Sequence, residues 1–161
     1  MRWIPLLVIL AACSGHDPLP GKTTFNRHTG TTVTTGPVGT TRADDLTMVL
    51  LQPTILTKKT GPISFDLTIA TNRSDNNWPK IHSVWRFGKR LPYKSLSTRR
   101  NGNDRTEFGE VPMSEATFED IAAKQFGYEI QIHGNPGIWT VTVDPAAFAE
   151  ALKLHRQDKV R

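Results

Sequence analysis

The sequence has little cysteine and few long hydrophobic runs, and both shortages restrict what the protein can be. It contains one cysteine, Cys13, so no disulfide can form within the chain. After residues 3–12 no second long apolar run follows, and spanning a bilayer as a helix takes about 20 apolar residues. With 37% hydrophobic and 22% charged residues, the composition is typical of a globular protein stabilised by packing.

Patterns of catalytic and metal-binding residues are also missing. The five histidines are His16, His28, His82, His133 and His155. None has a His or Cys partner at zinc spacing, and no Gly-x-Ser-x-Gly motif is present. A Ser-His-Asp triad assembled only by the fold stays open as an alternative. We therefore predict a protein that is not an enzyme and that uses neither a metal nor a cofactor.

The first residues have the pattern of a secretory signal peptide. Arg2 precedes ten residues without a charge, Trp3 to Ala12, and small residues then lead to Cys13. The run is about half of what a membrane-spanning helix needs. Two alternatives stay open: a buried first strand with Cys13 in the core, and cleavage by the ordinary signal peptidase.

The end of this segment, Leu10-Ala11-Ala12-Cys13, resembles the lipobox of bacterial lipoproteins. The resemblance covers residues 1–14. It implies cleavage between Ala12 and Cys13 and attachment of diacylglycerol, with fatty acids such as palmitate, to the Cys13 thiol. Ser14 is typical of lipoproteins sent to the outer membrane. Two or three acyl chains give a stable lipid anchor.

Composition divides the chain into three parts. Residues 1–12 are predicted to be the signal peptide. Residues 13–41 are predicted to be the lipidated N-terminus followed by a Thr/Gly-rich tether, because they offer few large apolar side chains to bury. Thr is also a good strand former, so pairing of Thr31–Thr41 on a sheet edge stays open. Residues 42–161 are predicted to form a single periplasmic domain.

Within that domain, hydrophobic patterns predict strands and late helices. Strands are expected over residues 46–51, 63–69, 81–87, 105–111, 128–133 and 138–143, a loop over 88–104, and helices over 115–125 and from Pro145 onward. In the strand 81–87, alternation places Trp85 and Phe87 inward and Arg86 outward. The expected fold is α+β: a mostly antiparallel sheet of about five to seven strands, with two C-terminal helices flanking a β-hairpin.

Positive charge is concentrated in the middle of the chain. Residues 73–105 carry nine Lys or Arg against two acids, and aromatic residues are interleaved among them. Cations beside aromatic faces suit phosphate, carboxylate or sugar ligands. The candidate anion-binding residues are Trp78, Arg86, Lys89, Arg90, Lys94, Arg99 and Arg100. The alternative is a solvated basic loop.

Together these patterns favour a non-enzymatic lipoprotein anchored in the outer membrane and facing the periplasm. Its domain would bind or support an envelope component, either a protein or an anionic glycan or lipid. Alternatives from other classes are an assembly accessory, such as a pilot protein of a secretion or pilus apparatus, and a peptidoglycan- or lipid-directed hydrolase. Nucleic acid is not an expected partner despite the pI near 9.6, because the signal peptide directs the chain out of the cytosol.

Overall fold

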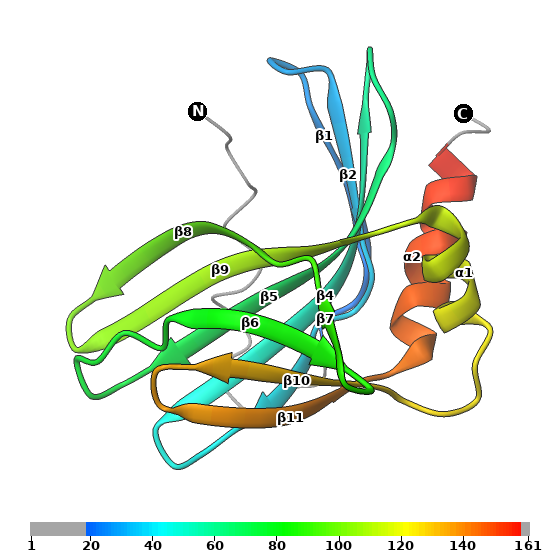
Figure 1. Cartoon of the computed structure of the whole chain (residues 1–161). Coiled ribbons are helices and arrows are strands. Elements are labelled where there is room, and N and C mark those ends of the chain that lie inside the picture. The colour runs from blue at the N-terminus through cyan, green and yellow to red at the C-terminus, as the bar shows by residue number, and fades with distance from the viewer. Residues whose placement is uncertain (1–18, 159–161) are drawn as a thin grey trace.

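A computed structural model describes residues 19–158 and shows an α+β fold built on antiparallel sheets, which confirms the predicted fold class (Figure 1). The described residues contain eleven strands, more than the expected five to seven, and two helices. The first sheet contains β1 (Lys22–Asn26), β2 (Thr31–Thr35), β3 (Gly39–Arg42), β4 (Thr47–Lys58), β5 (Ser64–Arg73), β8 (Lys94–Asn101) and β9 (Asp104–Met113). The second contains β6 (Ile81–Arg86), β7 (Lys89–Leu91), β10 (Tyr128–Gly134) and β11 (Gly137–Val143). The helices are α1 (Glu115–Ala122) and α2 (Pro145–Asp158).

The chain passes between the two sheets three times. The first sheet, called sheet A, has the strand order β1-β2-β4-β5-β9-β8, with β3 also paired to β4. The second, called sheet B, has the order β11-β10-β6-β7. The chain leaves sheet A after β5, returns with β8, and crosses again through α1 to β10. Strands β7 and β8, which carry most of the predicted cations, therefore each lie at the edge of a sheet.

The main core lies on one face of sheet A and is covered in two ways. Val49, Leu51 and Ile55 alternate along β4 and are buried on this face with residues of β5. Figure 1 shows sheet B against one half of sheet A and the two helices against the other half. The long strand β4 thus contributes to both halves of the core.

The two helices follow the predicted capping signals. Ser114 Oγ accepts a hydrogen bond of 3.1 Å from the Thr117 amide, and Asp144 Oδ1 accepts one of 2.9 Å from the Ala146 amide. Phe118 of α1 and Phe148 of α2 are fully buried, and their ring centroids lie 4.8 Å apart in an edge-on contact. The predicted helix pair flanking a hairpin is confirmed, although α1 ends at Ala122 rather than near Gln125.

The tether predicted over residues 13–41 is wrong for residues 22–41, which contribute to β1, β2 and β3. Both β2 and β3 pair with β4, so this segment lies along the edge of β4 that β5 leaves free. Thr favours strands, and Val38 is buried against Leu50 and Phe108 on the second face of sheet A. The alternative of pairing on a sheet edge describes what is observed, and the domain begins before residue 42.

The loop predicted over residues 88–104 is also wrong, because β7 and β8 form there. Phe87 and Gly88 make the two-residue turn between β6 and β7, and both have positive φ, 48° and 74°. The pairing of β6 with β10 shifts register between His133 and Gly134, so the alternation of β6 changes phase after Ile81. Val84 lies in the core, and Trp85, predicted inward, lies on the other face and stacks on His133. Phe87 consequently lies in solvent instead of the core, and Arg86 lies on the core-facing side beside Tyr128.

Candidate binding surface

The predicted cations form two groups at different places rather than one site. Lys89 and Arg90 lie on β7 next to the β6–β7 turn, whereas Arg99 and Arg100 lie at the far end of β8. Lys94, at the start of β8, forms an ion pair of 3.2 Å with Glu110. Figure 1 shows the β6–β7 turn and the β8–β9 hairpin pointing toward opposite ends of the molecule.

The first group is the sheet B tip, defined here as residues 86–90 together with 126–128. The Arg86 guanidinium lies between two rings, 4.4 Å from the centroid of Phe87 and 4.3 Å from that of Tyr128. Its Nε is buried and has no hydrogen-bond partner among the described residues. Burial raises the pKa of Tyr128, and the nearby charge of Arg86 offsets part of that rise. Arg86 is therefore held by aromatic faces, while Lys89 and Arg90 extend into solvent.

Two phenylalanines of this tip are exposed, and the sequence patterns did not single them out. Phe87 is 81% exposed and Phe126 is 82% exposed. Alternation along β6 wrongly placed Phe87 inside, and no periodic pattern covers Phe126. The available signal was Gly88, since a glycine between two short strand patterns predicts a tight turn and leaves the residue before it at a turn position.

The second group lies at the β8–β9 hairpin, where Trp78 covers a buried cation. Arg105 is 5% exposed, and its guanidinium carbon lies 5.5 Å from the Trp78 ring centroid. It donates hydrogen bonds to the carbonyls of Gly102 and Asp104 and to Asn76 Oδ1. Trp78 therefore packs on a structural arginine, and only Arg99 and Arg100 of this group are available to a ligand.

A buried carboxylate joins the two sheets near this point. Glu107 is 3% exposed and accepts hydrogen bonds from the Ile81 amide at 2.9 Å and the Tyr93 hydroxyl at 3.0 Å. Tyr93 lies directly over Gly109, where a Cβ atom would come within 2.3 Å of the Tyr93 hydroxyl. Burial, followed by the charge of Glu107, raises the pKa of Tyr93 well above its ordinary value. These contacts fix the start of β6 and the β7–β8 connection on β9.

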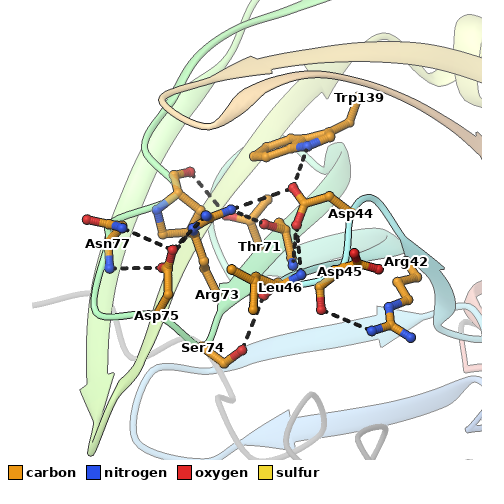
Figure 2. Close-up of polar contacts among 12 residues, drawn as sticks. Arg42, Asp44, Asp45, Leu46, Thr71, Arg73, Ser74, Asp75, Asn77 and Trp139 are labelled. Atoms are coloured by element: carbon orange, nitrogen blue, oxygen red, sulfur yellow. Dashed lines mark hydrogen bonds and ion pairs between the residues drawn. The ribbon is translucent and has the colours of Figure 1, made fainter.

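A second polar cluster joins the loop before β4, the loop after β5 and strand β11 (Figure 2). Arg73 donates to both carboxylate oxygens of Asp75, at 2.7 and 2.6 Å, and to Thr47 Oγ1 at 2.9 Å. Asp44 Oδ2 lies 3.6 Å from Arg73 Nη1 and accepts a hydrogen bond of 3.2 Å from Trp139 Nε1. Figure 2 shows Arg73 lying between the two carboxylates.

The electrostatics of this cluster favour a structural role. Hydrogen bonds from Arg73 and Asn77 lower the pKa of Asp75 to about 2. Burial raises the pKa of Asp44, but hydrogen bonds from Leu46, Thr47 and Trp139 outweigh it and leave the pKa below its ordinary value. Both carboxylates thus stay ionised at neutral pH and are engaged by donors of the protein itself. We interpret the cluster as a clamp that fixes two loops to sheet B.

The histidines of the described residues do not converge. His82 Nε2 lies 2.6 Å from Asn135 Oδ1, and His133 stacks on Trp85 with ring centroids 5.8 Å apart. No group of three or more His, Cys, Asp or Glu within residues 19–158 is arranged to hold a metal ion.

The predicted lipidation site at Cys13 and the cleavage site after Ala12 lie outside the described residues. Among residues 19–158, neither helix has the length and apolarity needed to cross a membrane.

Comparison of the chain with models of known protein families, with curated proteins and with solved structures finds no match. The fold and surface alone therefore describe the protein: it is a two-sheet α+β domain with basic edge strands and an aromatic tip.

Proposed function

We propose that this protein is a non-enzymatic lipoprotein of the outer membrane whose periplasmic domain binds an anionic component of the envelope through the cations of β7 and β8. The lipobox-like segment ending at Cys13 supports the membrane anchor. The exposed cations of the edge strands support the anionic partner.

One observation carries the binding part of the proposal. Lys89, Arg90, Arg99 and Arg100 form no ion pair with any carboxylate of the described residues. Other exposed cations, such as Arg27 and Lys59, also lack an ion pair with the described carboxylates, and what distinguishes these four is that they lie in adjacent pairs on the edge strands β7 and β8. Basic side chains left without an internal counter-charge attract anionic ligands, and guanidinium groups bind phosphate and carboxylate in a bidentate way.

Chain length keeps this domain close to the proposed anchor. Cys13 precedes the first strand residue, Lys22, by nine positions. A chain of nine residues reaches at most about 30 Å, so a lipidated Cys13 would hold the domain next to the bilayer. This short reach favours partners at the membrane surface, such as lipopolysaccharide phosphates or lipid headgroups.

The anchor is tested by the intact mass of the protein isolated from membranes of an expressing bacterium. Loss of residues 1–12 and addition of acyl chains, both abolished by Cys13→Ala, is the expected result. An unprocessed chain with a free thiol would contradict the anchor.

The anionic partner is tested by pull-down of envelope fractions with Arg99→Glu/Arg100→Glu. We expect weaker binding and a smaller salt dependence, because exposed charge interactions are screened by salt. The matched control, Arg27→Glu/Lys59→Glu, makes the same change in charge on exposed residues near the β1–β2 turn. Equal loss in both variants, or no loss in either, would contradict a specific role for β8.

A second candidate function is that of an assembly accessory, and the free edge of β8 favours it. β8 runs over eight residues and pairs only with β9 within the described part of the sheet. An extended segment of another protein could pair along this edge. Co-purification of a protein that is lost on Ser97→Pro, with glycan binding unchanged, would support this function.

A further inference from the structure

The turn at the sheet B tip places a phenylalanine where neither packing nor backbone preference calls for one. Phe87 has φ of 48° and is 81% exposed. Two-residue hairpin turns with positive φ at both positions strongly prefer Asn, Asp or Gly at the first position. A bulky residue there is strained, and such strain is concentrated at sites of function.

A second exposed aromatic ring lies at the same end of sheet B. Phe126, which is 82% exposed, precedes Tyr128 by two positions, and Arg86 bridges the rings of Tyr128 and Phe87. Figure 1 shows the β6–β7 turn and the connection from α1 to β10 at this end of the sheet. The tip therefore presents one exposed ring, Phe87, against the Arg86 guanidinium and a second exposed ring, Phe126, two positions before Tyr128.

The charge around these rings is positive. Arg86, Lys89 and Arg90 lie within four positions of one another, and Glu129 is the acid on the adjacent strand β10. Lys124 nearby is neutralised by Asp120 at 3.2 Å. Aromatic rings flanked by Lys and Arg are typical of protein segments that lie at the boundary between lipid headgroups and acyl chains. Basic side chains there interact with anionic headgroups.

We propose that the sheet B tip binds an anionic phospholipid surface, with Phe87 and Phe126 inserted between headgroups and with Lys89 and Arg90 on lipid phosphates. The inference rests on the proposed function in one respect: lipidated Cys13 would keep the tip within reach of a bilayer. The tip chemistry itself does not depend on the anchor. A protein partner on the same surface is the alternative that the experiment must separate.

The test is amide hydrogen exchange of the full chain, alone and with phosphatidylcholine vesicles that either contain or lack phosphatidylglycerol. We expect the amides of residues 86–90 and 126–128 to exchange several-fold more slowly with the anionic vesicles only, and high salt to reverse the effect. Amides of the β1–β2 turn, residues 27–30, serve as the internal reference and should not change. Unprotected tip amides on anionic vesicles would overturn the proposal and leave a protein as the occupant.

Variants separate insertion from general adsorption. Phe87→Asn/Phe126→Asn should weaken tip protection by about ten-fold or more in the vesicle concentration required, because burying a Phe ring is worth more than a factor of ten. Asn suits the positive φ at position 87, so the turn should form. The matched control is Phe25→Asn/Ile138→Asn, which replaces two exposed apolar residues elsewhere. Equal loss in the control would overturn the proposal.

Failure of the anchor and failure of the tip are distinguishable. The mass measurement reports on Cys13, whereas exchange reports on residues 86–90 and 126–128 themselves. A natural chain that is unprocessed at Cys13 but has a protected tip would support the lipid-binding tip and contradict the anchor, and a lipidated chain with an unprotected tip would do the reverse.

Discussion

The arginines of this domain fall into two classes that differ in their partners. Arg73 and Arg105 lie in or beside the core, and their guanidinium groups are engaged by a carboxylate, a hydroxyl, an amide oxygen or backbone carbonyls. Arg99 and Arg100 lie on the neighbouring edge strand β8 and contact no described carboxylate. All four come from the same basic stretch of sequence.

The difference shows that local charge density alone does not define a binding surface. Arg73 and Arg105 are directly paired positions on β5 and β9, on the face of sheet A that carries the core. An arginine at such a position must satisfy its donors inside the protein, because an unpaired buried charge is strongly unfavourable. An arginine on an edge strand is free of that requirement and can serve a ligand.

The largest expected effect comes from removing a clamped arginine. Arg73→Ala should lower the free energy of unfolding by about 2 kcal/mol, because it removes charged hydrogen bonds from a mostly buried group and leaves two carboxylates without their cation. Arg100→Ala, the matched control, should change it by less than about 0.5 kcal/mol. Urea denaturation measures both. Similar midpoints for the two variants would show that the two classes of arginine do not differ energetically.

The same clamp predicts a pH dependence of stability. The pKa of Asp75 is about 2 in the folded protein against an ordinary value of 3.8. A depressed pKa contributes stability that is complete above the unfolded value and is lost as the pH falls through the folded one. Stability should therefore decrease between about pH 4 and pH 2. Asp75→Asn should flatten the decrease in urea midpoints over this range, and an unchanged slope would argue against an ionised Asp75–Arg73 pair.

A substitution at the sheet B tip is expected to change the free energy of unfolding by a smaller amount and to increase it. Phe87→Asn should raise the free energy of unfolding by about 1 kcal/mol, because it relieves a strained backbone conformation without removing buried contacts. Thermal unfolding by circular dichroism measures the change. A stabilised variant that also loses vesicle binding would show that the aromatic tip lowers stability in favour of binding. Loss of stability would instead mean that Phe87 packs on Arg86 more strongly than its exposure indicates.

The smallest effect is expected for an exposed ion pair between the helices, which lies between the two classes. Arg156 contacts Glu119 at 2.8 Å, but both side chains are largely in solvent. Arg156→Ala should lower the free energy of unfolding by about 0.5 kcal/mol, and the loss should vanish at high salt. A loss of stability as large as that for Arg73→Ala would show that the contribution of these arginines to stability does not depend on their exposure.

The C-terminal part of the fold was predictable because its signals are local. Ser114 and Asp144 cap their helices as expected, and alternation over 128–133 and 138–143 matches the paired strands β10 and β11. The strands of the Thr-rich segment were not predictable in this way. They are fixed by pairing with β4 and have little apolar pattern of their own.

For the candidate site, the sequence predicted which residues are basic but not how they group. The connection after β7 carries the chain from sheet B to sheet A, so Lys89 and Arg90 lie on one sheet and Arg99 and Arg100 on the other. The register shift between β6 and β10 also exchanges the faces expected for Trp85 and Arg86. Such changes depend on where a strand shifts register or ends, which alternation alone does not specify.

The position of α2 has a consequence for when the domain can form. This last helix packs against β1, β2 and β4 near the start of the chain, and a Cβ atom at Gly36 would come within 2.0 Å of the Ala147 carbonyl oxygen. Strands β1 and β2 and part of β4 therefore lack this cover until α2 is present. Contacts between distant parts of a chain form late, because the intervening loop must first be closed. During synthesis the domain would thus remain incompletely folded until α2 has been made, long after β1 and β2 have left the ribosome.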